Sequence, residues 1–203
     1  MDIADDKSLR DVYLQPGPGA VNKQLARLDE HCRRFIELSP FLCIGTAAPG
    51  GLADVSPRGG EPGFVHVLDE TTLALPDRPG NNRLDTMTNI LAAPGVGLLF
   101  FIPGIEDTLR VNGLGRISKA PDLMQRFVER GKEPRSVLTV EVKEAYLHCT
   151  KALRRAALWD PETFQPRTAL PSAGQIYRDH CAVDIAADLI DRDLEADAKH
   201  NLY

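Results

Sequence analysis

The stretch Thr72-Leu73-Ala74-Leu75-Pro76-Asp77-Arg78-Pro79-Gly80-Asn81-Asn82-Arg83 predicts a strand that leads through a tight turn into a helix. Thr72–Leu75 is short and mostly apolar, and Pro76 is expected to end it. After the turn, apolar residues recur at helical spacing over residues 82–91. Asn81 or Asn82 can cap that helix, whose free N–H groups attract an anion. Arg83 adds a guanidinium whose shape matches phosphate oxygens. Taken alone, the turn fits a phosphate cradle, or a Pro-Gly turn followed by a solvated arginine.

Further short strands are expected on both sides of this turn. They are Phe41–Ala47, Leu52–Ser56, Phe64–Leu68, Val96–Ile102, Thr108–Ser118 and Ser136–His148, with short helices over Pro121–Arg130 and Thr150–Leu158. Short strands interrupted by small helices indicate a closed or half-closed antiparallel barrel with peripheral helices. The predicted fold class is therefore mainly β with peripheral helices (α+β), built on a six-stranded antiparallel barrel.

The chain is predicted to form a single domain over residues 1–203. Residues 1–40 are a helical lead, because the apolar residues of Ala20–Leu38 step by three and four as in an amphipathic helix. Residues 41–159 form the barrel core, and residues 160–203 form a loop and an acidic helix over Ala182–Ala198. That last helix is either a surface helix with a solvated acidic face or a dimer arm.

Composition excludes several classes of function. The formal net charge of −5 offers no attraction to nucleic acid or to an anionic membrane. No apolar run approaches the ~20 residues that cross a bilayer, and the N-terminus is acidic where a signal peptide is basic. A cytoplasmic location is expected. The four cysteines (Cys32, Cys43, Cys149 and Cys181) form no CxxC pair, so neither a zinc site nor a redox dithiol is predicted.

Three motifs, taken together, resemble the motifs of a known family. They are Ser56-Pro57-Arg58-Gly59, Pro79-Gly80-Asn81-Asn82-Arg83 and Leu109-Arg110-Val111-Asn112-Gly113, followed by His148-Cys149-Thr150-Lys151-Ala152 and Leu158-Trp159. In this order and spacing they resemble the pyridoxamine 5′-phosphate oxidase-like family of FMN-binding split barrels. The closest resemblance is to its subgroup of FMN-dependent enzymes of unassigned substrate. The likeness covers Leu38 to Trp159.

The resemblance implies which residues would hold FMN. Arg58, Asn82 and Arg83 match positions that bind the cofactor phosphate. Backbone groups of Ser56-Pro57 and of Leu75-Pro76 match strand segments that face the flavin ring. Arg110 faces cofactor or substrate, or is an exposed arginine on a strand.

The resemblance also implies a homodimer with the cofactor site at the subunit interface, because the C-terminal portion of one family subunit helps to close the site of the other. Lys151 would then reach the phosphate or the ring edge. Trp159 would pack as a wall of the site, or else be buried in an ordinary core or interface.

One departure from the true oxidases bears on the substrate. Those enzymes carry an Arg-Leu-His-Asp-Arg-like run after the tryptophan, whereas Trp159 is followed here by Asp160-Pro161-Glu162-Thr163-Phe164. Oxidation of pyridoxamine phosphate is therefore not expected. The predicted function is an FMN-dependent oxidoreductase of an unidentified small molecule, with no catalytic residue assigned and with Arg110 and His148 as the first to test. The alternatives are a flavin-binding module without turnover, or the same barrel holding a deazaflavin or haem.

Overall fold

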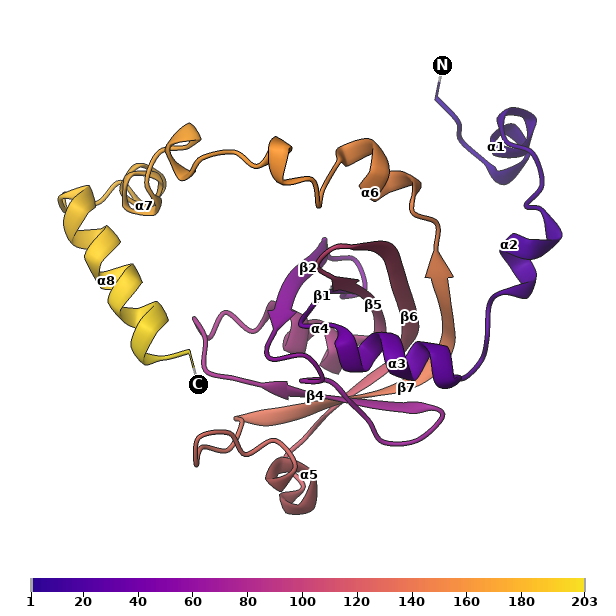
Figure 1. Cartoon of the computed structure of the whole chain (residues 1–203), viewed down its shortest axis with the longest axis horizontal. Helices are drawn as coiled ribbons and strands as arrows, with labels where there is room; N and C mark the ends of the chain where they lie inside the picture. The colour runs from indigo at the N-terminus through magenta and orange to yellow at the C-terminus, as the bar shows by residue number, and fades with distance from the viewer. Residues whose placement is uncertain (1, 203) are drawn as a thin grey trace.

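A single antiparallel sheet, curled into a barrel, forms the centre of the molecule (Figure 1). The computed structural model describes residues 2–202. Within that range the sheet has seven strands in the order β2-β1-β5-β6-β7-β4-β3. They are β1 (Phe41–Ala47), β2 (Ala53–Gly59), β3 (His66–Val67), β4 (Thr72–Asp77), β5 (Gly95–Ile102), β6 (Ile105–Ser118) and β7 (Ser136–His148). The predicted fold class is confirmed, with a seven-stranded sheet in place of a six-stranded barrel. The strand predicted over Phe64–Leu68 is reduced to the two residues of β3, which pair with β4.

The interior of the barrel is filled by one face of each strand. Ile44 pairs with Leu98, Leu98 with Val111 and Val111 with Ala145, and all four side chains are buried. Alternate residues along each strand point inward, so a local sequence pattern produces a continuous apolar layer. Burying one such aliphatic side chain stabilises the fold by about 1.5–3 kcal/mol.

Gly113 allows the long strand β6 to bend. The register with β7 shifts between Asn112 and Gly113, and a Cβ on Gly113 would lie 2.2 Å from the carbonyl oxygen of Glu141. Only a residue without a side chain permits this approach.

The predicted single helix over residues 20–38 is wrong, because the chain is extended in its middle. Helix α1 (Asp6–Val12) is followed by α2 (Pro18–Asn22) and by α3 (Glu30–Leu38). Between α2 and α3, Leu25 forms an antiparallel bridge with Ala145 of β7, with N–O distances of 3.0 and 2.8 Å. Helix α3 packs Cys32 and Ile36 onto the core, and Asp29 caps its first turn.

Two boundaries around the central turn also differ from the prediction. Strand β4 continues through Pro76 to Asp77, because β3 pairs only with Leu73 and Ala74 and leaves the far side of Pro76 without a strand partner. Proline is tolerated at such an edge. Helix α4 (Asp85–Ala92) begins after Arg83 and not at Asn82, and α5 (Pro121–Gln125) is shorter than predicted.

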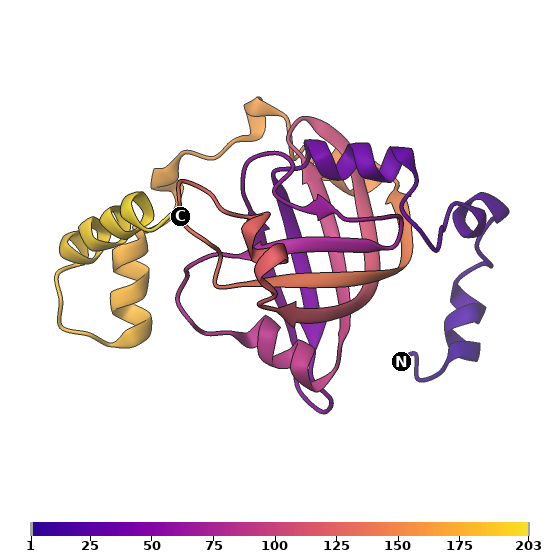
Figure 2. The same cartoon turned by 90° about the horizontal axis from the view of Figure 1, so that it is seen from below.

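The C-terminal part of the chain forms an arm that leads away from the barrel. It consists of α6 (Lys151–Ala156), two 3-10 turns (Pro161–Thr163 and Arg167–Ala169), α7 (Ala173–Cys181) and α8 (Ala187–His200). Helices α7 and α8 pack together as a hairpin (Figure 1), and Figure 2 shows the barrel between this hairpin and the N-terminal helices. The sequence predicted one acidic helix here and missed α7. No helix among residues 2–202 has both the length and the apolar character needed to cross a membrane.

Candidate functional site

A cavity of about 710 Å³ opens where the edge strand β2, the end of β4 and the start of α4 meet. Six residues predicted from the sequence line it together: Ser56, Pro57, Arg58, Pro76, Asn82 and Arg83. Leu75 does not line it, because its side chain points into the core and is 3% exposed. The walls include the apolar side chains of Phe64, Met87 and Ile117. The cavity thus combines apolar walls with arginine side chains.

The loop before α4 shapes one side of the cavity. Asn82 (φ 59°) and Leu84 (φ 61°) both adopt the left-handed conformation, which is uncommon for residues other than glycine and costs most for a side chain such as leucine. The Asn81 side chain accepts a hydrogen bond from the backbone N–H of Arg83 at 3.1 Å. The N-cap of α4 is therefore Leu84, without a side-chain cap, and the prediction that Asn81 or Asn82 caps the helix is wrong.

Asn82 instead meets a residue that the sequence did not indicate. Arg135, which precedes β7, donates from Nη1 to the side-chain oxygen of Asn82 at 2.8 Å. Arg135 lines the same cavity as Arg58 and Arg83. The pairing of β7 with β4 brings it there, since its backbone N–H donates to the carbonyl of Asp77 at 2.8 Å. No local motif around Arg135 signals this role.

The guanidinium groups differ in how firmly they are held. Arg58 donates to the carbonyl oxygen of its neighbour Pro57 at 2.8 Å. Arg83 is bound through Nε to the carboxylate of Asp85, yet its side chain is 78% exposed. That carboxylate raises the pKa of Arg83. Arg83 is therefore charged, and its exposed side chain would have to leave or share the Asp85 carboxylate to bind an anion in the cavity.

Asp77 adds a negative group to the same cavity. Burial raises the pKa of Asp77 above its ordinary value, although Arg58 and Arg135 act in the opposite direction. Burial disfavours the charged form of a carboxyl. Asp77 therefore holds its proton more tightly than an exposed aspartate does.

A hydrogen-bonded group ties the start of α4 to strand β2. The buried hydroxyl of Thr86 donates to Oδ2 of Asp54 at 2.7 Å, and the hydroxyl of Ser56 donates to the same carboxylate at 3.1 Å. Charge-assisted bonds of this kind are stronger than neutral ones. They hold the start of α4 beside Arg58.

A second cluster lies on β6 and β7, away from the cavity. Arg110 donates to the hydroxyl of Tyr146 at 2.9 Å, and Lys23 lies over the Tyr146 ring at 5.3 Å. His148 contacts the same ring at 5.2 Å between centroids, and its buried Nε2 has no hydrogen-bond partner within residues 2–202. Burial, together with Arg110 and Lys23, lowers the pKa of His148. A buried polar atom without a partner is costly to the fold.

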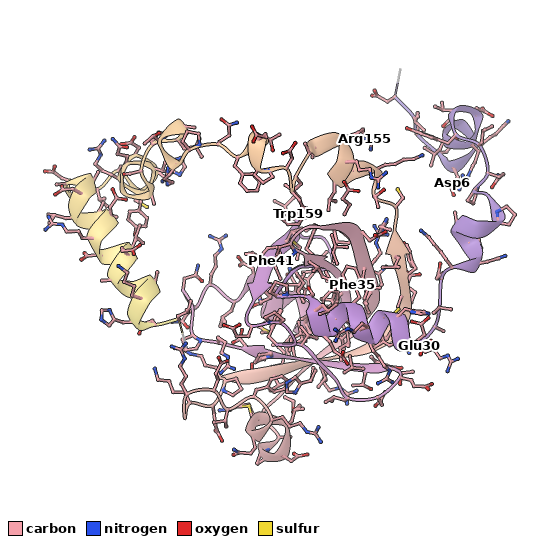
Figure 3. All side chains as sticks on the ribbon, in the orientation of Figure 1. Asp6, Glu30, Phe35, Phe41, Arg155 and Trp159 are labelled. Atoms are coloured by element: carbon pink, nitrogen blue, oxygen red, sulfur yellow. The ribbon has the colours of Figure 1, made fainter. Side chains whose placement is uncertain are left out.

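Trp159 and Lys151 lie where the arm leaves the barrel. The indole Nε1 of Trp159 donates to the carbonyl oxygen of Ile105 at 2.9 Å, and Figure 3 shows this tryptophan between α6 and the barrel. Lys151 is exposed at the start of α6. Neither residue, nor Arg110, lines the 710 Å³ cavity of its own chain. Their contribution to a cofactor site stays a prediction.

The family model for pyridoxamine 5′-phosphate oxidase matches residues 28–149, which is more than half of the chain. The chain belongs to the pyridoxamine 5′-phosphate oxidase family. The match contains the barrel and every residue that lines the 710 Å³ cavity. It ends before Lys151, Trp159 and the C-terminal arm, so these parts lie outside the region that defines the family.

Solved structures resemble this chain at low sequence identity. A histidine-to-alanine variant of HupZ from Group A Streptococcus is 14% identical, with a TM-score of 0.50, over 60% of this chain and 99% of that chain. A candidate pyridoxamine 5′-phosphate oxidase from Lactobacillus delbrueckii is 18% identical (TM-score 0.48; 61% and 98% covered). An FAD-binding protein from Mycobacterium smegmatis is 14% identical (TM-score 0.42; 61% and 97% covered). A comparison with curated protein sequences finds no match.

Proposed function

We propose that the chain binds FMN in the 710 Å³ cavity and acts as a flavin-dependent oxidoreductase on a small molecule. The observation that carries the proposal is the meeting of Arg58, Arg83 and Arg135 in one cavity that also has apolar walls. Guanidinium groups bind phosphate oxygens through paired, charge-assisted hydrogen bonds. Membership of the pyridoxamine 5′-phosphate oxidase family supports the same cofactor class.

The residues present fit the parts of FMN. Arg58, Asn82, Arg83 and Arg135 would hold the phosphate, and the apolar walls would accept the flat ring. Strand β2 pairs with β1 alone, so the outer backbone groups of Ser56 and Pro57 have no strand partner. Strand β4 is likewise without β3 beyond Ala74, which leaves the cavity side of Pro76 without a strand partner. FMN, when bound, supplies hydride and electron transfer, and the protein supplies orientation and electrostatics.

The second half of the site is proposed to come from another copy of the chain in a homodimer. Arg110 and His148 line no part of the cavity in their own chain, and the buried Nε2 of His148 lacks a partner among residues 2–202. In a homodimer both side chains would contact the cofactor of the partner subunit. Lys151 and Trp159 would close that site from the start of the arm.

Replacing Arg83 with alanine tests the phosphate assignment. Arg83→Ala is expected to weaken FMN binding about ten- to a hundredfold, because a charge-assisted hydrogen bond contributes about 1.5–3 kcal/mol. Riboflavin lacks the phosphate, so its affinity should change little. Fluorescence titration of both ligands measures the difference, and Arg116→Ala, an exposed arginine outside the cavity, is the matched control. Equal losses for both ligands would contradict the assignment.

The visible absorbance spectrum of the purified protein, followed by mass analysis of the released small molecule, tests the cofactor itself. Release of FMN supports the proposal. Release of a deazaflavin or haem would identify a different ligand in the same barrel. A protein that carries FMN but oxidises no reduced nicotinamide or organic substrate would be a flavin-binding module without turnover.

A further inference from the structure

A second, smaller cavity of about 240 Å³ lies beside the FMN cavity. The two cavities share the walls formed by Gly59, Phe64, Pro76 and Arg78. The smaller one extends from this shared wall towards the segment after α5, where it reaches Phe127. A molecule bound in it would therefore lie next to whatever occupies the larger cavity.

Two stacked planar rings line the smaller cavity. The imidazole of His66 lies on the ring of Phe127, with centroids 4.1 Å apart and planes at 26°. Phe127 is 4% exposed and packs with Met124 and Val137, so it is held in place. Because Phe127 is buried and His66 is only partly so, the imidazole is the flat surface that this pair offers to a planar group in the cavity.

The charged side chains around the smaller cavity differ in how far a neighbouring charge neutralises them. Arg78 and Glu129 form an ion pair at 3.0 Å with side chains that are 19% and 35% exposed, so they largely neutralise each other. The Arg126 side chain forms no hydrogen bond or ion pair within the described residues 2–202. Glu61 also lines the cavity. Burial, and then the charge of Arg126, lower the pKa of His66. Arg126 therefore supplies a positive charge close to the imidazole.

We propose that this second cavity binds the carboxylate of a small planar organic acid between Arg126 and His66, with the ring of the acid directed towards the FMN cavity. A single guanidinium fork matches the two oxygens of a carboxylate. A phosphate dianion would find only Arg126 without a carboxylate partner here, whereas three arginines (Arg58, Arg83 and Arg135) line the larger cavity. The role of this acid as a substrate rests on the proposed flavin function, whereas its binding in the cavity does not depend on that function.

Calorimetric titration of the purified protein with benzoate tests the site. Benzoate is expected to bind, and benzyl alcohol, which has the same ring without the charge, is expected to bind at least tenfold more weakly. Arg126→Gln should weaken benzoate about tenfold or more, whereas Arg116→Gln should leave it unchanged. Because both arginines are exposed, neither change threatens the fold.

The ionisation of His66 provides an independent readout. Bound benzoate should raise the pKa of His66, followed by NMR, since a carboxylate favours the imidazolium. Arg126→Gln should raise the same pKa in the ligand-free protein by removing a positive neighbour.

Three results would overturn the inference: equal benzoate affinity in the Arg126→Gln variant, equal affinity for benzyl alcohol, or loss of benzoate binding in Arg58→Gln and not in Arg126→Gln. The last would place benzoate in the larger cavity. The flavin function is tested separately. If benzoate binding depends on Arg126 in a protein that fails to take up FMN, the result supports the acid-binding cavity and contradicts the proposed cofactor.

Discussion

Asp77 shows how a single residue can weaken the fold near a binding site. Its carboxyl is half-buried and feels the positive charges of Arg58 and Arg135, but burial outweighs their attraction and raises its pKa above the ordinary value of 3.8. The folded state therefore holds this proton more tightly than the unfolded state does. The resulting stabilisation is present below about pH 4 and is lost as the pH rises through the raised pKa.

Asp77→Asn is accordingly expected to raise the melting temperature by a few degrees at pH 7, because the amide avoids the buried charge. At about pH 3, where Asp77 is protonated in both states, the variant and the original protein should melt together. Calorimetric scans at both pH values measure this. Asp184→Asn makes the same charge change at an exposed position and should have little effect. A lower melting temperature for Asp77→Asn at pH 7 would mean that the two arginines outweigh burial.

At the scale of elements, the α7–α8 hairpin depends on a close approach at Gly174. A Cβ at this position would lie 2.2 Å from the carbonyl oxygen of Ala187 and 3.0 Å from the backbone nitrogen of Asp191. The N–H of Gly174 donates to Oδ1 of Asp191 at 2.7 Å. The two helices are thus positioned by backbone contact, with Gly174 and Ile190 as their buried residues.

Gly174→Ala is expected to loosen this hairpin, although alanine favours helix by about 1 kcal/mol over glycine. The clash with Ala187 involves backbone and cannot be relieved by a rotamer change. Hydrogen–deuterium exchange should become faster in residues 173–200 and remain unchanged in the barrel. Gly19→Ala, which lies in α2 with no atom within 4 Å of the added Cβ, is the control. Unchanged exchange in α7 and α8 would show that the hairpin tolerates the side chain.

At the scale of the whole molecule, the proposed cofactor site has two halves on separate parts of one chain. Arg58 and Arg83 belong to the cavity half, and Arg110 and His148 to the other half. In a symmetric dimer each site would take one half from each copy. The architecture can therefore be tested by mixing subunits.

Two double variants are each expected to bind FMN poorly on their own: Arg58→Ala/Arg83→Ala and Arg110→Ala/His148→Gln. Co-expressed in equal amounts, they should form mixed dimers in which one site combines both intact halves. FMN content should then recover to about a quarter of all sites, since about half of the dimers are mixed and one of their two sites is intact. Absorbance of the purified mixture measures the recovery. No recovery would mean that both halves act within one chain, or that the second half is not part of the site.

Local patterns predicted the elements whose structure depends on near neighbours. The alternation of Leu138, Val140 and Val142 with polar residues predicted a strand over Ser136–His148, and β7 has these bounds. The motifs around Arg58 and Arg83 placed both residues at one cavity. Leu25 shows the opposite case: it fits the helical pattern, but its pairing with Ala145 holds the chain extended.

The sequence by itself determined the mainly β fold class and the position of most strands, and it singled out the arginines of the central motifs as candidate site residues. It could do so because alternation, helical spacing and turn residues act over a few positions. Only the tertiary structure brought Arg135 to Asn82, half-buried Asp77 near two arginines and formed the second cavity, which His66 and Arg126 both line. These contacts join segments that lie far apart along the chain. Their geometry depends on strand pairing across the whole sheet, which no local pattern encodes.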